Sequence, residues 1–167
     1  MMQTPENKLK TALMAGQVQH GIWLTSGAAV LAELAGKAGF DWCLIDGEHG
    51  PNTVSEILSQ LQALAISDTP SVVRIANAEA WMVKQVLDLG CQTVLVPMVD
   101  DAATAQAMAH AMRYPPDGNR GMGAVLARAT SWGSVSDYLH AANAQMCLLV
   151  QTESAAAVAN IDAIAAT

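Results

Sequence analysis

Five short apolar runs recur along the chain, separated by stretches that have the spacing of helices. The runs are rich in Val, Ile, Leu, Trp and Cys, which is typical of strands buried on both faces of a parallel sheet. We expect strands at residues 21–24, 42–46, 71–75, 93–99 and 146–151. Helices are expected at residues 6–15, 28–38, 54–65, 80–89 and 102–113, and from residue 154 onward.

Capping residues lie at the ends of several of these helices. Thr53 followed by Glu56 has the spacing of a capping box, and Asp100 or Asp101 stands where the helix at 102–113 needs an N-cap. Gly90 follows the helix at 80–89 in the position that favours a left-handed residue. These signals support the predicted helix ends.

Strands that alternate with helices of this length indicate βαβ units and a parallel sheet with right-handed crossovers. Such units build a doubly wound sheet or a (β/α)8 TIM barrel. The segment Leu24-Thr-Ser-Gly-Ala-Ala29 lacks the GxGxxG pattern of a dinucleotide fold. Polar clusters follow several strands and not one switch point, which favours the barrel.

The chain is shorter than a whole barrel. A (β/α)8 barrel typically takes about 250 residues, whereas the chain has 167. We therefore expect a single domain, residues 1–167, made of an N-terminal helix and about the first five βα units of a barrel. The connection at 114–145 is long enough to be a functional loop, and within it we expect a turn at Pro115-Pro-Asp-Gly118 and a short helix over residues 131–140.

Composition narrows the class of protein and its partners. Hydrophobic residues make up 52% of the chain and charged residues 14%, which excludes a disordered polymer. The net charge of −7 and the eight dispersed Lys and Arg argue against a nucleic-acid partner. The polar start at residues 1–10 and the absence of an 18-residue apolar span predict a cytoplasmic protein with no membrane partner. Cys43, Cys91 and Cys147 have no metal-binding or redox spacing and are expected to be reduced thiols.

Three polar clusters follow predicted strands, and they hold the candidate catalytic residues. His49 lies in the turn Asp46-Gly-Glu-His49, where an imidazole suits proton transfer near neutral pH. Arg74 ends a strand, so its guanidinium either emerges at the mouth of the barrel to bind a carboxylate or enolate oxygen, or forms an ion pair with Asp46 or Glu48. Both interpretations can hold together. His20, His110 and His140 lack such a setting and are expected at the surface.

The third cluster, Gln151-Thr-Glu153, follows the last predicted strand. The carboxylate of Glu153 can be a hard ligand for Mg²⁺ or Mn²⁺, with the amide of Gln151 beside it to orient substrate. Alternatively, Glu153 is an acid at a helix N-terminus that interacts with the helix dipole. The lysines at 8, 10, 37 and 84 fall in predicted helices, which disfavours a Schiff-base mechanism.

Several motifs together resemble those of the metal-dependent class II pyruvate aldolases, typified by 4-hydroxy-2-oxoheptanedioate aldolase. They are Leu44-Ile-Asp-Gly-Glu-His-Gly50, Val73-Arg-Ile75, Leu87-Asp-Leu-Gly90, Val94-Leu-Val-Pro-Met-Val99, Tyr114-Pro-Pro-Asp-Gly-Asn-Arg-Gly121 and Val150-Gln-Thr-Glu153. The resemblance spans nearly the whole chain. It implies a TIM barrel that binds a divalent cation (Mg²⁺, Mn²⁺ or Co²⁺), cleaves 4-hydroxy-2-oxo acids to pyruvate and an aldehyde, serves aromatic catabolism, and forms a homo-oligomer, with a hexamer suggested.

The resemblance also implies a role for each matched residue. Glu153 would be a metal ligand, Gln151 a substrate contact, Arg74 the group that binds the substrate and stabilises the pyruvate enolate, and His49 the acid-base residue on the aldehyde side. The family couples this histidine to an acid that matches Asp88. Because Asp88 ends a predicted helix at the opposite rim, a neighbouring subunit would have to supply it.

Some questions stay open from the sequence. Asp46 is expected to orient water or His49, and Glu48 receives no role. The family's second carboxylate ligand would lie beyond Thr167. The alternative functions are a related C–C lyase of the citrate lyase β or malyl-CoA type, and a catalytically incomplete fragment that acts as an oligomerisation module.

Overall fold

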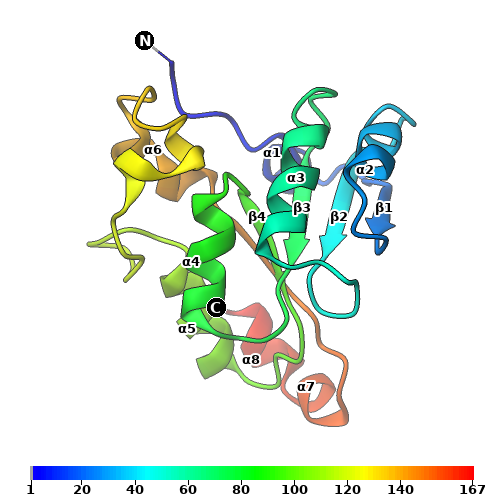
Figure 1. Ribbon diagram of the computed structural model, residues 1–167. Helices are drawn as coiled ribbons and strands as arrows, with labels where there is room; N and C mark the ends of the chain where they lie inside the picture. Colours follow the sequence, from blue (N-terminus) through cyan, green and yellow to red (C-terminus); the bar gives the residue numbers. More distant parts are fainter. Residues whose placement is uncertain (1) are drawn as a thin grey trace.

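The computed structural model describes residues 2–167, which form one parallel sheet with helices packed against it (Figure 1). The strands are β1 (Gly21–Leu24), β2 (Trp42–Asp46), β3 (Ser71–Arg74), β4 (Thr93–Val96) and β5 (Cys147–Val150). Each strand pairs in parallel with the next one along the chain, so the sheet order is β1-β2-β3-β4-β5.

The helices alternate with the strands as the hydrophobic pattern predicts. Helix α1 (Lys8–Met14) precedes the sheet, and α2 (Ala29–Gly36), α3 (Val54–Leu64), α4 (Ala80–Asp88) and α5 (Ala102–Ala111) follow β1 to β4 in turn. The connection to β5 contains two short 3₁₀ turns, η1 (Ala124–Leu126) and η2 (Arg128–Thr130), and helix α6 (Tyr138–Gln145). Helices α7 (Ala155–Ala159) and α8 (Ile161–Ala165) follow β5.

The strand order of the described residues lacks the reversal of a doubly wound sheet. A doubly wound sheet reverses its order at a switch point, whereas these five strands lie side by side in the order of the sequence. The predicted α/β class with a parallel sheet is confirmed. Within residues 2–167 the sheet is open, because β1 and β5 each pair with one strand only.

The two faces of the sheet carry different cores, because side chains alternate along a strand. One face, with Ile45, Val73 and Val94, packs against the layer of helices. On the other face Leu44, Val72, Leu95 and Leu149 contact each other and Leu9 of α1, which covers the end where the strands begin. We call this second face of the sheet the inner face. Asp46 and Arg74 lie on it two residues beyond Leu44 and Val72, so the alternation places charged side chains at the C-terminal ends of the strands.

The predicted caps are confirmed, and the ambiguous one is settled. The Thr53 N–H donates to the Glu56 carboxylate at 2.9 Å. Asp101, and not Asp100, caps α5 by accepting from the N–H of Thr104 at 2.7 Å. Gly90 follows α4 with φ of 95°.

Several predicted boundaries were too generous. The strand expected at 93–99 ends at Val96, because Pro97 has no N–H for the ladder and Met98 has φ of 52°. The strands expected at 71–75 and 146–151 are Ser71–Arg74 and Cys147–Val150, and the helices expected at 6–15 and 102–113 are Lys8–Met14 and Ala102–Ala111.

Two helix predictions were wrong in a more informative way. The short helix expected over 131–140 begins only at Tyr138, because Ser131 and Trp132 have left-handed φ values of 50° and 53°. The helix expected from 154 is broken at Asn160, whose side chain donates to the backbone oxygen of Asp100 at 2.8 Å. The hydrophobic pattern contains no signal for the left-handed residues or for the Asn160 hydrogen bond.

Other predictions from composition agree with the structure. All three cysteines are free, with Cys43 and Cys91 buried and Cys147 partly buried. The histidines at 20, 110 and 140 are exposed. Among the residues that the structure describes, no helix is both long and apolar enough to cross a membrane.

Candidate active site

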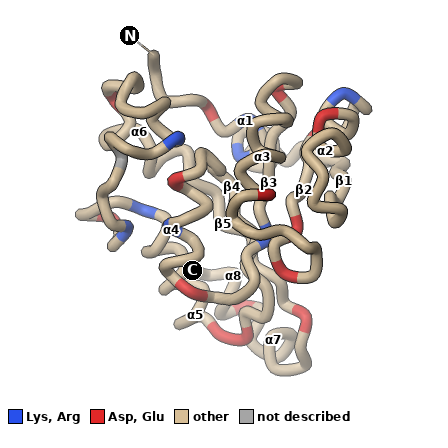
Figure 2. The backbone as a smooth tube through the Cα atoms, viewed as in Figure 1, with Lys and Arg blue, Asp and Glu red and all other residues tan. Residues whose placement is uncertain are grey.

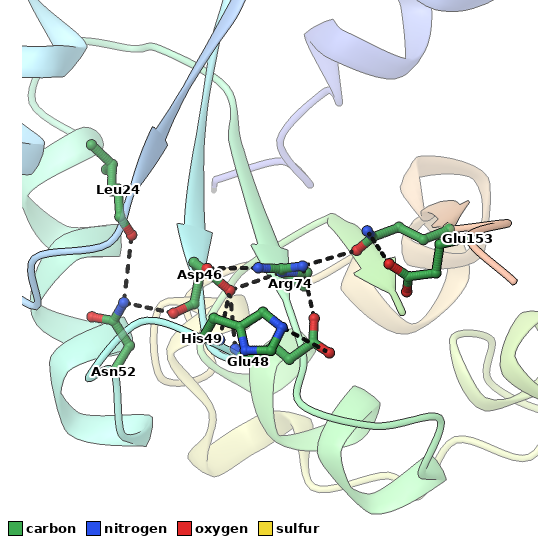
Figure 3. A network of polar contacts seen from close by, with 8 residues as sticks. Leu24, Asp46, Glu48, His49, Asn52, Arg74 and Glu153 are labelled. Carbon is green, nitrogen blue, oxygen red and sulfur yellow. Dashed lines mark hydrogen bonds and ion pairs between the residues drawn. The ribbon is translucent and has the colours of Figure 1, made fainter. Parts of the chain in front are cut away.

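The C-terminal ends of the strands bring most of the predicted site residues together (Figure 3). Asp46 ends β2, Arg74 ends β3, and Gln151 directly follows β5. Asp46 and Arg74 are register partners, and partners on neighbouring parallel strands point to the same face. Both side chains therefore lie at the inner face of the sheet.

Asp46 and Arg74 form a buried bidentate ion pair. Arg74 Nε donates to Asp46 Oδ1 at 2.8 Å, and Nη2 donates to Oδ2 at 2.7 Å. The two residues are only 1% and 7% exposed. The ring of Trp23 lies 4.6 Å from the guanidinium carbon, which adds a cation–π contact. The predicted ion pair is confirmed, and it fixes the plane of the guanidinium.

The ion pair sets the charge of both groups. Burial by itself would raise the pKa of Asp46, but the hydrogen bonds from Arg74 and from the N–H groups of Glu48 and His49 lower it below its ordinary value. The hydrogen bond to Asp46 raises the pKa of Arg74. Asp46 is thus a carboxylate at neutral pH, and Arg74 is a permanent cation.

The Asp46 carboxylate also shapes the loop between β2 and α3. Its Oδ1 accepts the N–H of Glu48 at 3.0 Å and that of His49 at 3.3 Å. The turn brings Glu48 Oε2 to 2.7 Å from Arg74 Nη1, an ion pair without the directed geometry of a hydrogen bond. Arg74 therefore faces two acids, and Glu48, which had no role from the sequence, is the second of them.

His49 is the most accessible of these side chains. It is 76% exposed, and its Nε2 lies 3.7 Å from Glu48 Oε1. An exposed imidazole beside a carboxylate can exchange protons with a bound molecule.

Gln151 and Glu153 continue the network across to β5. Gln151 Oε1 accepts from Arg74 Nη1 at 3.3 Å, and its Nε2 donates weakly to Glu153 Oε2 at 3.4 Å. Glu153 Oε1 accepts the N–H of Met98 at 2.8 Å. The polar contacts thus run from the end of β2 to the segment after β5 (Figure 3).

The edge around this network is acidic. Apart from Arg74, the described segments between a strand end and the next helix hold no Lys or Arg, and their acids are Asp46, Glu48, Glu79, Asp100, Asp101 and Glu153. Figure 2 shows the remaining basic residues dispersed over other elements. Such an edge attracts cations. No group of three or more His, Cys, Asp or Glu in residues 2–167 is placed to hold a metal ion.

Asp88 lies away from the other candidates, as the sequence predicts. It is the last residue of α4, at the end of the sheet where the strands begin. Its Oδ1 accepts from Nη2 of Arg120 at 2.7 Å, and Arg120 stacks on Tyr114 with 4.5 Å from guanidinium carbon to ring centroid. Within one chain Asp88 does not meet His49.

Two neighbours of the network were missed from the sequence. Trp23 shares the inner face with Gly21 by simple alternation, so the period of β1 could have placed it there. Asn52 donates to the backbone oxygen of Asp46 at 2.7 Å. Its position just before a helix cap gives no signal of that contact.

The sequence and the fold match one family of known proteins. The sequence model of the family "HpcH/HpaI aldolase/citrate lyase" matches residues 19–167. A hydroxypyruvate/pyruvate aldolase of Agrobacterium fabrum is 53% identical over 165 residues, which are 99% of this chain and 62% of that protein. A 2-keto-3-deoxy-L-rhamnonate aldolase of Klebsiella pneumoniae is 48% identical over 158 residues, covering 95% of this chain and 59% of that protein. The chain thus spans about three fifths of the length of these relatives.

A solved structure agrees with both comparisons. The crystal structure of a family protein from Burkholderia cenocepacia J2315 superposes with a TM-score of 0.92 at 40% identity, covering 96% of this chain and 65% of that one. Because the family model covers most of the chain and the fold agrees with that structure, this chain belongs to the HpcH/HpaI aldolase/citrate lyase family, whose members resemble class II pyruvate aldolases.

Proposed function

We propose that this chain carries the catalytic edge of a lyase that reversibly cleaves 4-hydroxy-2-oxo acids to pyruvate and an aldehyde. The observation that carries the proposal is the Arg74 guanidinium, fixed by Asp46 at the strand ends with His49 and Glu153 in the same network. The names of the relatives support the reaction class, since they are aldolases.

Arg74 stabilises the negative charge that the reaction creates. In the cleavage direction the C3–C4 bond breaks, and its electron pair forms the enolate of pyruvate, with negative charge on the former keto oxygen. A fixed guanidinium near that oxygen interacts more strongly with the transition state than with the neutral ketone, which lowers the barrier. The fork to Asp46 means that this donor needs no reorganisation during the reaction.

His49 accepts the proton that the substrate loses on its aldehyde side. The C4 hydroxyl must lose its proton as the aldehyde forms, and the exposed imidazole of His49 can accept it. Asp46, through its bonds to the N–H groups of Glu48 and His49, orients the histidine.

Glu153 would hold a divalent cation, Mg²⁺, Mn²⁺ or Co²⁺. Its carboxylate stands at the acidic edge. Its Oε1 accepts the Met98 N–H, but its Oε2 has only the long bond from Gln151, so Oε2 fits one ligand position of a hard cation. When bound, such an ion supplies Lewis-acid stabilisation of charge on the substrate's keto oxygen. Gln151, between Arg74 and Glu153, would contact the pyruvate part of the substrate.

We also propose the architecture that this chemistry requires. The five sequentially ordered units would form part of the wall of a single-domain (β/α)8 barrel, whose mouth is the edge that carries Arg74. Asp88 would reach His49 of a neighbouring copy, so the active form would be a homo-oligomer.

The aldehyde is the least defined part of the proposal. The sequence resemblance favours 4-hydroxy-2-oxoheptanedioate, whereas the relatives are named for hydroxypyruvate and for 2-keto-3-deoxy-L-rhamnonate. All of these reactions share pyruvate chemistry at the Arg74 end. A citrate-lyase-type reaction on acyl-CoA thioesters is the alternative that the family name allows, and the dispersed basic residues in Figure 2 speak against a nucleotide-binding surface.

The test measures two reactions of the intact protein. We expect exchange of the pyruvate methyl protons with D₂O and cleavage of a 4-hydroxy-2-oxo acid, both lost with a chelator and restored by Mg²⁺, Mn²⁺ or Co²⁺. Borohydride trapping of a pyruvate adduct would contradict the metal-dependent class. Cleavage of acyl-CoA thioesters without pyruvate exchange would favour the citrate-lyase alternative. If the protein catalysed none of these reactions, only a structural role would remain.

A further inference from the structure

We propose that Asn52, held by the buried Gln60, is a positioning residue that fixes the loop carrying Glu48 and His49. The inference rests on the proposed function, because it assigns the loop a task in aldol cleavage. It starts from the contacts of Asn52 with the ends of β1 and β2, which the proposed chemistry does not use (Figure 3).

Asn52 joins the ends of two neighbouring strands. Its Nδ2 donates to the backbone oxygen of Asp46, at the end of β2, at 2.7 Å, and lies 3.5 Å from that of Leu24, at the end of β1. Asn52 is 9% exposed, so these groups are shielded from water, and a lost partner would not be replaced freely.

Gln60 holds the other end of the Asn52 amide. Its Nε2 donates to Asn52 Oδ1 at 2.6 Å, and Gln60 itself is wholly buried on α3. The Asn52 amide therefore accepts from the helix and donates to the strand ends. A side chain that lacks either function cannot make this link, and Asp is the near-isosteric replacement that lacks the donor.

The loop is closed from two sides at Asp46. The carboxylate of Asp46 holds the N–H groups of Glu48 and His49, and the backbone oxygen of Asp46 is held by Asn52. Gly50 packs closely inside this ring, since a Cβ there would lie 2.5 Å from the Asp46 oxygen and 2.8 Å from Asn52 Nδ2. Five residues, 47–51, span the closed ring, so the position of His49 depends on the Asn52 contact.

The first experiment needs no activity. Amide hydrogen exchange is measured over residues 47–50 in the intact protein for Asn52→Asp, Asn52→Ala and the control Ser59→Ala, an exposed position on α3, the helix that carries Gln60. We expect the loop in both Asn52 variants to exchange about tenfold faster or more than in the control. The strand β4 provides the internal reference for global stability.

The second experiment separates positioning from general damage. Cleavage of a 4-hydroxy-2-oxo acid, which needs His49, is expected to fall about tenfold or more in the Asn52 variants, with pyruvate proton exchange changed by less than about threefold. Unchanged loop exchange, or equal losses in both reactions, would overturn the inference. A wild-type protein without either reaction would instead overturn the proposed function, and the hydrogen exchange would still decide whether Asn52 fixes the loop.

Discussion

At the scale of single residues, the site depends on how the donors of one guanidinium are shared. Asp46 takes the Nε and Nη2 side of Arg74, and Glu48 and Gln151 contact Nη1. The Asp46 side is a structural fork with both oxygens engaged. At Nη1 the contacts are a non-directional ion pair and a long hydrogen bond. These are the contacts that a substrate oxygen can displace.

Replacing Arg74 by Ala should abolish exchange of the pyruvate methyl protons. The enolate loses its guanidinium partner, at a cost of about 3 kcal/mol or more by analogy with other oxyanion donors. Arg74→Lys should restore little, because a point charge cannot form the fork to Asp46. The measurement is loss of the methyl signal in D₂O, and near-normal exchange in the Ala variant would assign Arg74 to structure alone.

His49→Ala should impair aldol cleavage more than pyruvate proton exchange. The imidazole is exposed, with its Nε2 3.7 Å from Glu48 Oε1, and His49 donates to Asp46 through its backbone N–H. Removal of the ring therefore leaves the Arg74 network in place. We expect cleavage to fall by about 10²-fold or more, the usual contribution of a general acid or base. Equal losses in the two assays would make His49 an organiser of the pocket.

The Asp46–Arg74 pair predicts an acid limb of stability. Because the folded pKa of Asp46 lies below its ordinary value of about 3.9, the unfolded chain binds the proton first, and the stabilising contribution is complete above that value. It is lost as the pH falls through the folded pKa. Denaturant unfolding between pH 6 and about 2.5 should show a weaker acid dependence in Asp46→Asn than in the wild type, and identical pH dependence would contradict this.

At the scale of the elements, the sequence predicted the type of every strand and its place in the order. This succeeded because buried parallel strands such as Val94-Leu-Val96 are continuous apolar runs, and because Thr53 and Asp101 mark helix starts locally. The failures at 131–140 and at Asn160 have the opposite cause. Left-handed residues and a side chain that bonds a distant backbone oxygen are decided by tertiary contacts.

One strand pairing can be tested at this scale. The Trp42 ring of β2 covers Gly21 of β1, and a Cβ at Gly21 would lie 2.1 Å from a ring atom. Gly21→Ala should therefore lower the free energy of unfolding by about 1–3 kcal/mol, the usual cost of overpacking. Gly123→Ala, with no atom within 4 Å of the added Cβ, is the matched control. Equal thermal midpoints for the two variants would contradict the packing.

At the scale of the whole molecule, the sequence predicted which residues gather and which one does not. Asp46, His49, Arg74, Gln151 and Glu153 meet because all follow or end parallel strands at one edge. Their partners were harder to predict. Side-chain geometry decides how the donors of Arg74 are divided between Asp46 and Glu48, and it also decides the contact of Asn52 with the Asp46 backbone. The hydrophobic periodicity of the sequence does not contain this geometry.

The remote Asp88 gives the last prediction. It stands at the opposite end of the sheet, bonded to the buried Arg120, so only a second copy can bring it to His49. His49→Ala and Asp88→Ala proteins should each lose cleavage, and hybrids re-formed from equal amounts should regain about one quarter of the wild-type rate, since a complete site then needs one intact residue from each of two neighbours. Hybrids of His49→Ala with Arg74→Ala are the control, because both residues belong to one edge of one chain and cannot complement. Cleavage that stays absent in the first hybrid, or full activity of Asp88→Ala alone, would place Asp88 outside the reaction and leave its bond to Arg120 as its role.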